Sequence, residues 1–117
     1  MLHLVGIKNC NKIRDTKAWL DEREIPYTFV DVKKDPLTKD ELLELKAKVG
    51  LDTLINRRGM MWRKLKLADQ DLSDEELLEK LREHQNMMKR PLLIAGDAVM
   101  VGYDEEAMQS FIDEYIG

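Results

Sequence analysis

Two short apolar runs near the start of this chain flank a stretch with helical periodicity. The runs Leu2–Ile7 and Tyr27–Val32 have the length and the β-branched content of buried strands. Between them, Ile13, Thr16 and Leu20 recur at the spacing that puts side chains on one face of a helix. Neighbouring strands that are joined by a crossing helix lie parallel. The beginning of the chain therefore predicts a βαβ unit.

A second pair of apolar runs lies near the end of the chain. Pro91–Ile94 and Ala98–Val101 are separated by a short segment with a Gly96-Asp97 turn signal, which predicts a β-hairpin. A final helix is expected from about Asp104. Four of its residues share one stripe that should face inward: Ala107, Met108, Phe111 and Tyr115. This part of the chain predicts a ββα unit.

The segment between these halves carries helix start signals. Thr38 with Glu41, and Ser73 with Glu76, each match a capping box, and Gly50 should stop the first helix. The inward residues are expected to be Leu42, Leu45 and Val49 in the first helix, and Leu77, Leu78 and Leu81 in the second. Residues 51–71 should form short helices and turns. We therefore expect a helical insertion over about residues 38–88.

This order of elements indicates an α/β fold of the thioredoxin-like class. Its βαβ and ββα halves should form one mixed four-stranded sheet, with the helical insertion between them. The chain has 117 residues, 44% of them hydrophobic, which is enough for one continuous core. Residues 1–117 are therefore expected to form a single domain.

Composition excludes several classes of protein. The chain has 23 acidic and 19 basic residues, so its net charge of -4 argues against direct nucleic-acid binding and against binding to anionic membranes. No leader pattern or membrane-spanning apolar run is present, and we expect a cytoplasmic protein. One cysteine permits neither an intrachain disulfide nor a cysteine zinc site. His3 and His84 are isolated, so no metal is expected.

The single cysteine, Cys10, stands where the first strand gives way to a helix. Free N–H groups and the positive end of the helix dipole favour a thiolate there, and the pKa should fall below the ordinary value of about 8.5. Lys8, Lys12 and Arg14 add positive charge. Arg14, four residues on, is the expected partner of the thiol. The alternative is that Cys10 is an inert apolar filler.

Four motifs support a family resemblance over nearly the whole chain. The run Gly6–Arg14 resembles the Cys-x-x-x-Arg loop of ArsC-type proteins, in the Gly-Ile-Lys-x-Cys form of the YffB branch. Asn56–Leu65 resembles the Asn-x-x-Gly-x-x-[Trp/Phe]-Arg-Lys-Leu segment of YffB-like proteins. Lys89–Pro91 resembles the Arg-Pro before the third strand, and Val101–Tyr103 the Val-Gly-[Tyr/Phe] of Spx and YffB. The chain is thus identified as a member of the arsenate reductase-like ArsC/Spx/YffB superfamily.

The resemblance implies a site. Cys10 would be the nucleophile, Arg90 would lie near it beside Arg14, and Pro91 would be a cis-proline that faces the cysteine loop. Asn56, Arg57 and Arg58 compete for the place of the arginine that ArsC enzymes carry in this region. The residues expected to bind substrate or glutathione are Lys8, Asn9, Asn11, Arg57, Arg58 and Pro91.

Two departures from the family pattern narrow the expected function. Arsenate reductases carry an arginine where this chain has Gly102, and a histidine where it has Gly6. Arsenate is therefore not the expected substrate. Ile13 stands where some Spx regulators have a second cysteine, which excludes an internal disulfide switch.

Two functions stay open. The first is a glutathione-dependent thiol oxidoreductase without a bound cofactor, resolved by glutathione or a glutaredoxin-like reductant. The second is an Spx-like, non-catalytic regulator that binds RNA polymerase.

Overall fold

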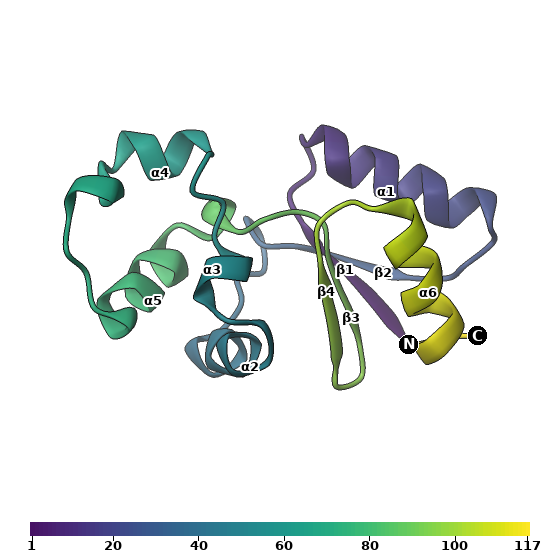
Figure 1. Ribbon diagram of the computed structural model, residues 1–117. Helices are drawn as coiled ribbons and strands as arrows, with labels where there is room; N and C mark the ends of the chain where they lie inside the picture. Colours follow the sequence, from purple (N-terminus) through teal and green to yellow (C-terminus); the bar gives the residue numbers. More distant parts are fainter. The chain divides into compact units, whose positions relative to one another are not determined.

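The computed structural model describes residues 1–117, and the chain divides into two compact units (Figure 1). The first unit consists of Met1–Asp31 together with Arg90–Gly117, and the second is Val32–Lys89. All four strands belong to the first unit, whereas the expected insertion of about residues 38–88 lies within the second.

The first unit is built on a mixed four-stranded sheet, as the sequence predicts. Its strands are β1 (Leu2–Gly6), β2 (Thr28–Asp31), β3 (Leu92–Ala95) and β4 (Ala98–Val101), in the order β2-β1-β3-β4. β1 pairs parallel with β2 and antiparallel with β3, and β3 pairs antiparallel with β4. The α/β, thioredoxin-like class is therefore confirmed, and β4 is an edge strand.

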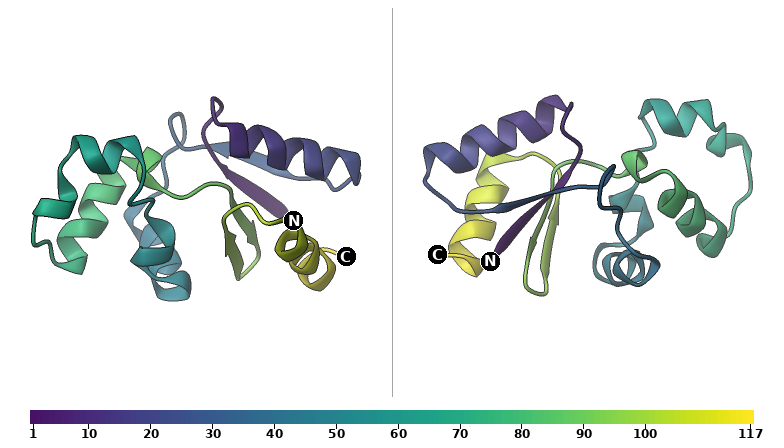
Figure 2. Two further views of the ribbon diagram at one scale, coloured as in Figure 1. Left: turned by 45° about the horizontal axis from the view of Figure 1, so that its top comes forward. Right: turned by 180° about the vertical axis from the view of Figure 1, so that it is seen from behind.

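Helices α1 (Asn11–Glu22) and α6 (Glu105–Tyr115) pack on one face of this sheet (Figure 2). Alternate strand residues such as Leu4 and Leu93 meet Ile13 of α1 and Met108 of α6 in one core. All four are fully buried. Removing any of these side chains to alanine would cost about 2–5 kcal/mol.

The expected inward stripe of α6 is partly wrong. The buried residues of α6 are Met108, Phe111 and Ile112, whereas Ala107 and Tyr115 are exposed. β4 is the edge of the sheet, so no further strand lies beyond it to cover that side of the helix.

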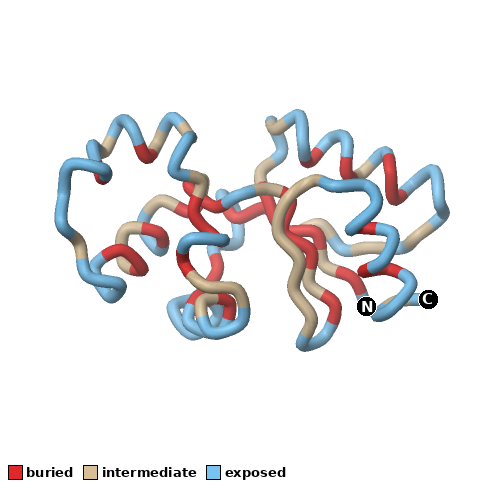
Figure 3. The backbone as a smooth tube through the Cα atoms, viewed as in Figure 1, coloured by how far each residue is buried: buried red, intermediate tan, exposed pale blue.

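The second unit is helical. It contains α2 (Lys39–Val49), α3 (Leu51–Leu54), α4 (Met60–Lys64) and α5 (Asp74–Glu83), with 3-10 turns η1 (Leu67–Asp69) and η2 (Gln85–Met87). Both expected capping boxes are formed, at Thr38 and at Ser73. The residues of α2 and α5 that were expected to face inward are buried, except for Val49, which is half-buried (Figure 3).

A buried glutamine ties the ends of this helical unit together. The Gln85 side chain donates to the Leu37 carbonyl oxygen and accepts from the Leu37 N–H, each over 2.8 Å. Buried amides need such partners, because an unsatisfied one costs about 1–3 kcal/mol. No helix of either unit is long and apolar enough to span a bilayer.

Candidate active site

Cys10 stands at the corner between β1 and α1. It is the N-cap of α1, with an extended backbone (φ -141°, ψ 127°), and its carbonyl oxygen accepts the N–H of Arg14 over 3.0 Å. The residue is half-buried and packs against the core of the first unit. The thiol is therefore at the boundary between core and solvent, where a substrate can reach it.

The surroundings of the thiol favour its ionised form. Burial raises the pKa of Cys10. The backbone N–H groups of Ile13 and Lys12 and the guanidinium of Arg90 lower it, and together they lower it by more than burial raises it. The net effect is a pKa below the ordinary value for a cysteine, in the direction that the sequence predicts. The sulfur makes no cap hydrogen bond of ordinary geometry, so these N–H groups stay available to a thiolate.

Arg90 reaches the cysteine corner because of the strand pairing. Val5 of β1 lies opposite Leu92 of β3, which places the residues just before β3 beside the end of β1. The Pro91 carbonyl oxygen accepts the N–H of Gly102 over 2.9 Å and so continues the pairing of β3 with β4. The Arg90–Pro91 peptide bond is cis, as the resemblance implies. Arg90 is thus a guanidinium held against the thiol by the sheet.

Arg14, by contrast, faces solvent. Its side chain is 73% exposed, and its Nε lies 3.6 Å from Oδ1 of Asp15. It is absent from the groups that shift the pKa of Cys10. The expectation that Arg14 partners the thiol is therefore not what the structure shows, because Cys10 has extended backbone and the four-residue helical spacing does not apply to it. A role for Arg14 in catalysis stays a prediction.

The structure explains why residue 6 is glycine, which the sequence alone did not. A Cβ on Gly6 would overlap Cδ1 of Ile13, would come within 2.8 Å of Cγ1 of Ile13, and would lie 3.9 Å from Cδ of Arg90. Ile13 is fully buried, so it has little room to move aside. Glycine at this position therefore lets the Ile13 side chain pack against the end of β1, and the Cβ of a histidine here would force that side chain to move.

The loop residues around Cys10 are open to solvent. Lys8, Asn9 and Asn11 are exposed, and Asn11 is the first residue of α1. Their polar side chains flank the thiol in the chain and lie outside the core. No group of three or more His, Cys, Asp and Glu side chains with metal-site geometry is present.

The second unit separates the three candidates for the family's arginine position. Asn56 is committed to the local turn: its Oδ1 accepts the N–H of Arg58 over 3.1 Å. Arg57 pairs with Asp52 over 2.7 Å and lies 4.8 Å over the ring of Trp62. The Arg58 side chain is exposed and has no hydrogen bond or ion pair, so of the three it has no partner to give up before it binds an anion.

Comparisons with known proteins agree on the family. The ArsC family model matches residues 5–111. The Global transcriptional regulator Spx 1 of Bacillus cereus is 30% identical over 114 residues, which cover 96% of this chain and 87% of that protein.

Solved structures give the same picture. A protein named YFFB superposes with a TM-score of 0.87 at 32% identity, covering 94% of this chain and 97% of that one. An arsenate reductase (ArsC) related protein from Brucella melitensis has a TM-score of 0.78 at 29% identity, covering 95% and 93%. A match over most of the chain, with the sheet order and the cysteine corner described above, shows that the chain belongs to the ArsC family.

Proposed function

We propose that the protein is a glutathione-dependent thiol oxidoreductase that uses Cys10 as its only nucleophile. The observation that carries this proposal is the lowered pKa of a half-exposed thiol at an uncapped helix start. An inert core cysteine has the opposite tendency, since burial without such partners raises the pKa. Selective activation of one thiol is what disulfide exchange requires.

The reaction consists of two exchange steps. The Cys10 thiolate attacks the glutathione sulfur of a mixed disulfide, forms a new disulfide with glutathione, and releases the substrate thiolate. The thiolate of a second glutathione then attacks the glutathione sulfur on Cys10, which releases oxidised glutathione and restores the Cys10 thiolate. The substrate disulfide gains two electrons, and two glutathione molecules, one of them from the substrate, become oxidised glutathione. A single cysteine suffices because the second thiol comes from outside.

Arg90 is the residue best placed to assist these steps. Its guanidinium offers a positive charge and hydrogen-bond donors to each sulfur that becomes anionic. The exposed Lys8, Asn9 and Asn11 supply donors for the carboxylates and amides of glutathione. Binding of glutathione by Arg58, which belongs to the second unit, stays a prediction.

Mass spectrometry with oxidised glutathione tests the proposal. Reduced protein should acquire one glutathione on Cys10, and added reduced glutathione should remove it. The Cys10→Ser variant should acquire none and should have no activity toward a glutathionylated peptide. A wild-type thiol that stays unmodified, or a variant that stays active, would rule out the nucleophile assignment.

A second candidate is a regulator without catalysis. It is favoured by the 30% identity to a protein named as a global transcriptional regulator, over 96% of this chain. In that case RNA polymerase would be the partner, and Cys10 would not take part in a catalytic cycle. A pull-down with purified RNA polymerase distinguishes the two: retention by polymerase together with an inert thiol supports the regulator, and turnover without retention supports the enzyme.

A further inference from the structure

The free edge of the sheet in the first unit leaves hydrogen-bonding groups without partners. β3 and β4 are joined by a two-residue turn, and Leu93 lies opposite Met100. The N–H of Gly102 bonds to the Pro91 carbonyl oxygen, so the bonded positions of β4 are Ala98, Met100 and Gly102. The N–H and C=O groups of the alternate residues, Val99 and Val101, therefore point away from β3. No other strand lies on that side.

This edge lacks most of the devices that keep edge strands from pairing. β4 has the sequence Ala-Val-Met-Val, with no charged residue, no proline and no bulge in its pairing. All four residues are half-buried. Only the shortness of β4 protects it, so the edge is a template for another strand.

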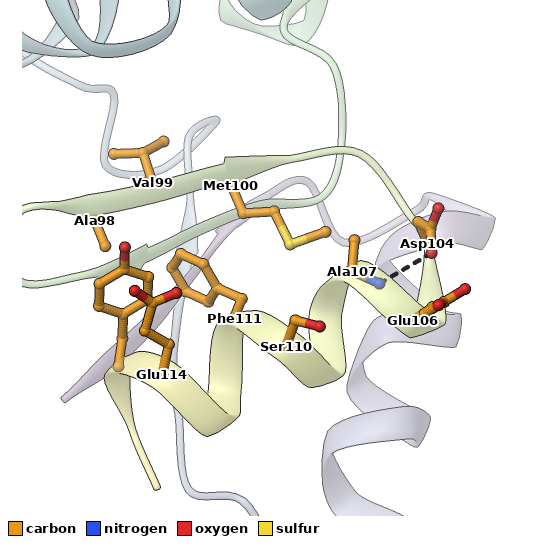
Figure 4. Close-up of a pocket in the computed structure, with 10 residues that line it drawn as sticks. Ala98, Val99, Met100, Asp104, Glu106, Ala107, Ser110, Phe111 and Glu114 are labelled. Carbon is orange, nitrogen blue, oxygen red and sulfur yellow. Dashed lines mark hydrogen bonds between the residues drawn. The ribbon is translucent and has the colours of Figure 1, made fainter.

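A groove of about 630 Å³ lies between β4 and α6 (Figure 4). Ala98 and Met100 of β4 and Phe111 of α6 supply apolar side chains along it. Tyr115 also lines the groove, with its ring centroid 5.0 Å from that of Phe111, and is half-exposed. The groove therefore offers an apolar middle that one inserted side chain could cover.

Carboxylates stand at both ends of this groove. Glu114 lies at one end, and Asp104 and Glu106 lie at the other (Figure 4). Glu106 and Glu114 are exposed and form no ion pair or hydrogen bond, while Asp104 caps α6 by accepting the N–H of Ala107 over 3.0 Å. No lysine or arginine follows Arg90 in the chain. The groove is thus acidic, with no cation of its own segment to balance it.

We propose that this groove binds an extended segment of a partner protein, which adds a strand to β4 and carries the pattern Lys-x-Φ-x-Lys, where Φ is apolar. Strand addition satisfies the free backbone groups, and alternate side chains enter the groove. Glu106 and Glu114 are eight residues apart, about 12 Å along a helix. Two lysines four residues apart in a strand span about 13 Å, with the apolar residue midway on the same face.

A second copy of this chain is a poorer occupant. Two β4 edges paired about a two-fold axis would bring both acidic ends of one groove against those of the other. Like charges that face each other destabilise such a contact, whereas a basic segment is attracted to it.

The test uses the whole protein and a synthetic peptide, Thr-Lys-Thr-Leu-Thr-Lys-Thr, followed by amide NMR. Saturable shifts at Val99 and Val101, with slower hydrogen exchange of both amides, are expected. Glu106→Gln combined with Glu114→Gln should weaken binding about tenfold, the equivalent of roughly two exposed ion pairs. Glu44→Gln with Glu75→Gln removes the same charge from exposed positions in the second unit and should change nothing.

Two N-methylated peptides test the strand addition separately from the charge. One is methylated at leucine, and the other at the two threonines that flank leucine, so that only one of them loses the N–H groups that face β4. The peptide that loses the N–H groups facing β4 should fail to bind, and the peptide that keeps them should bind. Binding of both, no saturable shift up to about 1 mM peptide, or protection of Val99 that rises with protein concentration alone would overturn the proposal.

Discussion

The starts of α2 and α5, in the helical unit, differ from the start of α1, in the unit with the sheet. In the helical unit, Thr38 and Ser73 close complete capping boxes, and acidic residues occupy the first turns of α2 and α5. In the unit with the sheet, α1 begins at Cys10 with no side-chain cap and no acidic residue in its first turn. α2 and α5 use their N–H groups for stability. α1 leaves its N–H groups to the thiol.

This difference shows that the start of α1 lacks a stabilising contact that α2 and α5 have. A cap of the Thr or Ser kind contributes typically about 1 kcal/mol, and α1 lacks one. The free N–H groups and Arg90 instead lower the pKa of the thiol against the effect of burial. A feature that costs stability and activates a nucleophile is expected at a functional site.

Replacing the nucleophile gives the largest expected effect. Cys10→Ser should lower glutathione-dependent turnover by at least about a hundredfold, because a serine hydroxyl ionises far above neutral pH. The same change should raise the free energy of unfolding by up to about 1 kcal/mol, because serine is a preferred N-cap. Turnover assays and urea denaturation measure the two effects. A destabilised variant would contradict the account of the uncapped helix start.

Removing the guanidinium near the thiol should have the next largest effect. Arg90→Gln should raise the pKa of Cys10 and slow its alkylation at pH 7 by about tenfold, the lower range for a hydrogen bond to a charged group. Arg14→Gln is the matched control, since Arg14 faces solvent, and it should leave the rate unchanged. The alkylation rate of Cys10 in the two variants is measured by mass spectrometry. A slower rate in Arg14→Gln than in Arg90→Gln would mean that Arg14 is the partner of the thiol.

Removing a cap should have the smallest effect, and only on stability. Thr38→Ala and Ser73→Ala should each lower the free energy of unfolding by about 1 kcal/mol. Neither should change the alkylation rate of Cys10. Urea denaturation followed by circular dichroism measures the loss. An effect below about 0.3 kcal/mol in both variants would mean that the capping boxes do not distinguish these helices from α1.

Local patterns predicted the frame of the molecule, because they depend on neighbours in the sequence. The capping boxes at Thr38 and Ser73, the hairpin and the cysteine at the start of α1 are of this kind. The family motifs also anticipated the cis peptide bond before Pro91.

What the sequence did not predict depends on contacts between distant segments or on backbone conformation. Helical spacing indicated Arg14 as the partner of the thiol, but Cys10 has an extended backbone, and the pairing of β1 with β3 brings Arg90 beside it instead. The outward positions of Ala107 and Tyr115 follow from β4 being the edge strand. The need for Gly6 follows from the buried Ile13 across the corner, and Arg57 is held by Asp52 and Trp62.

The account of Cys10 also fixes the sign of a pH dependence. The pKa of the thiol is lower in the folded protein than in the unfolded chain, where it is about 8.5. Ionised Cys10 therefore stabilises the fold above about pH 8.5, and this contribution is lost as the pH falls through the folded pKa. The difference in the free energy of unfolding between wild type and Cys10→Ser, measured as a function of pH, isolates this contribution.

The most direct measurement is the pH profile of iodoacetamide alkylation of Cys10, in the folded protein and in the same chain unfolded in urea. The unfolded chain provides the reference, with a midpoint near 8.5. The account predicts a lower midpoint for the folded protein, because the N–H groups of Ile13 and Lys12 and the Arg90 guanidinium hold the pKa down. A folded midpoint equal to or above the unfolded one would contradict it.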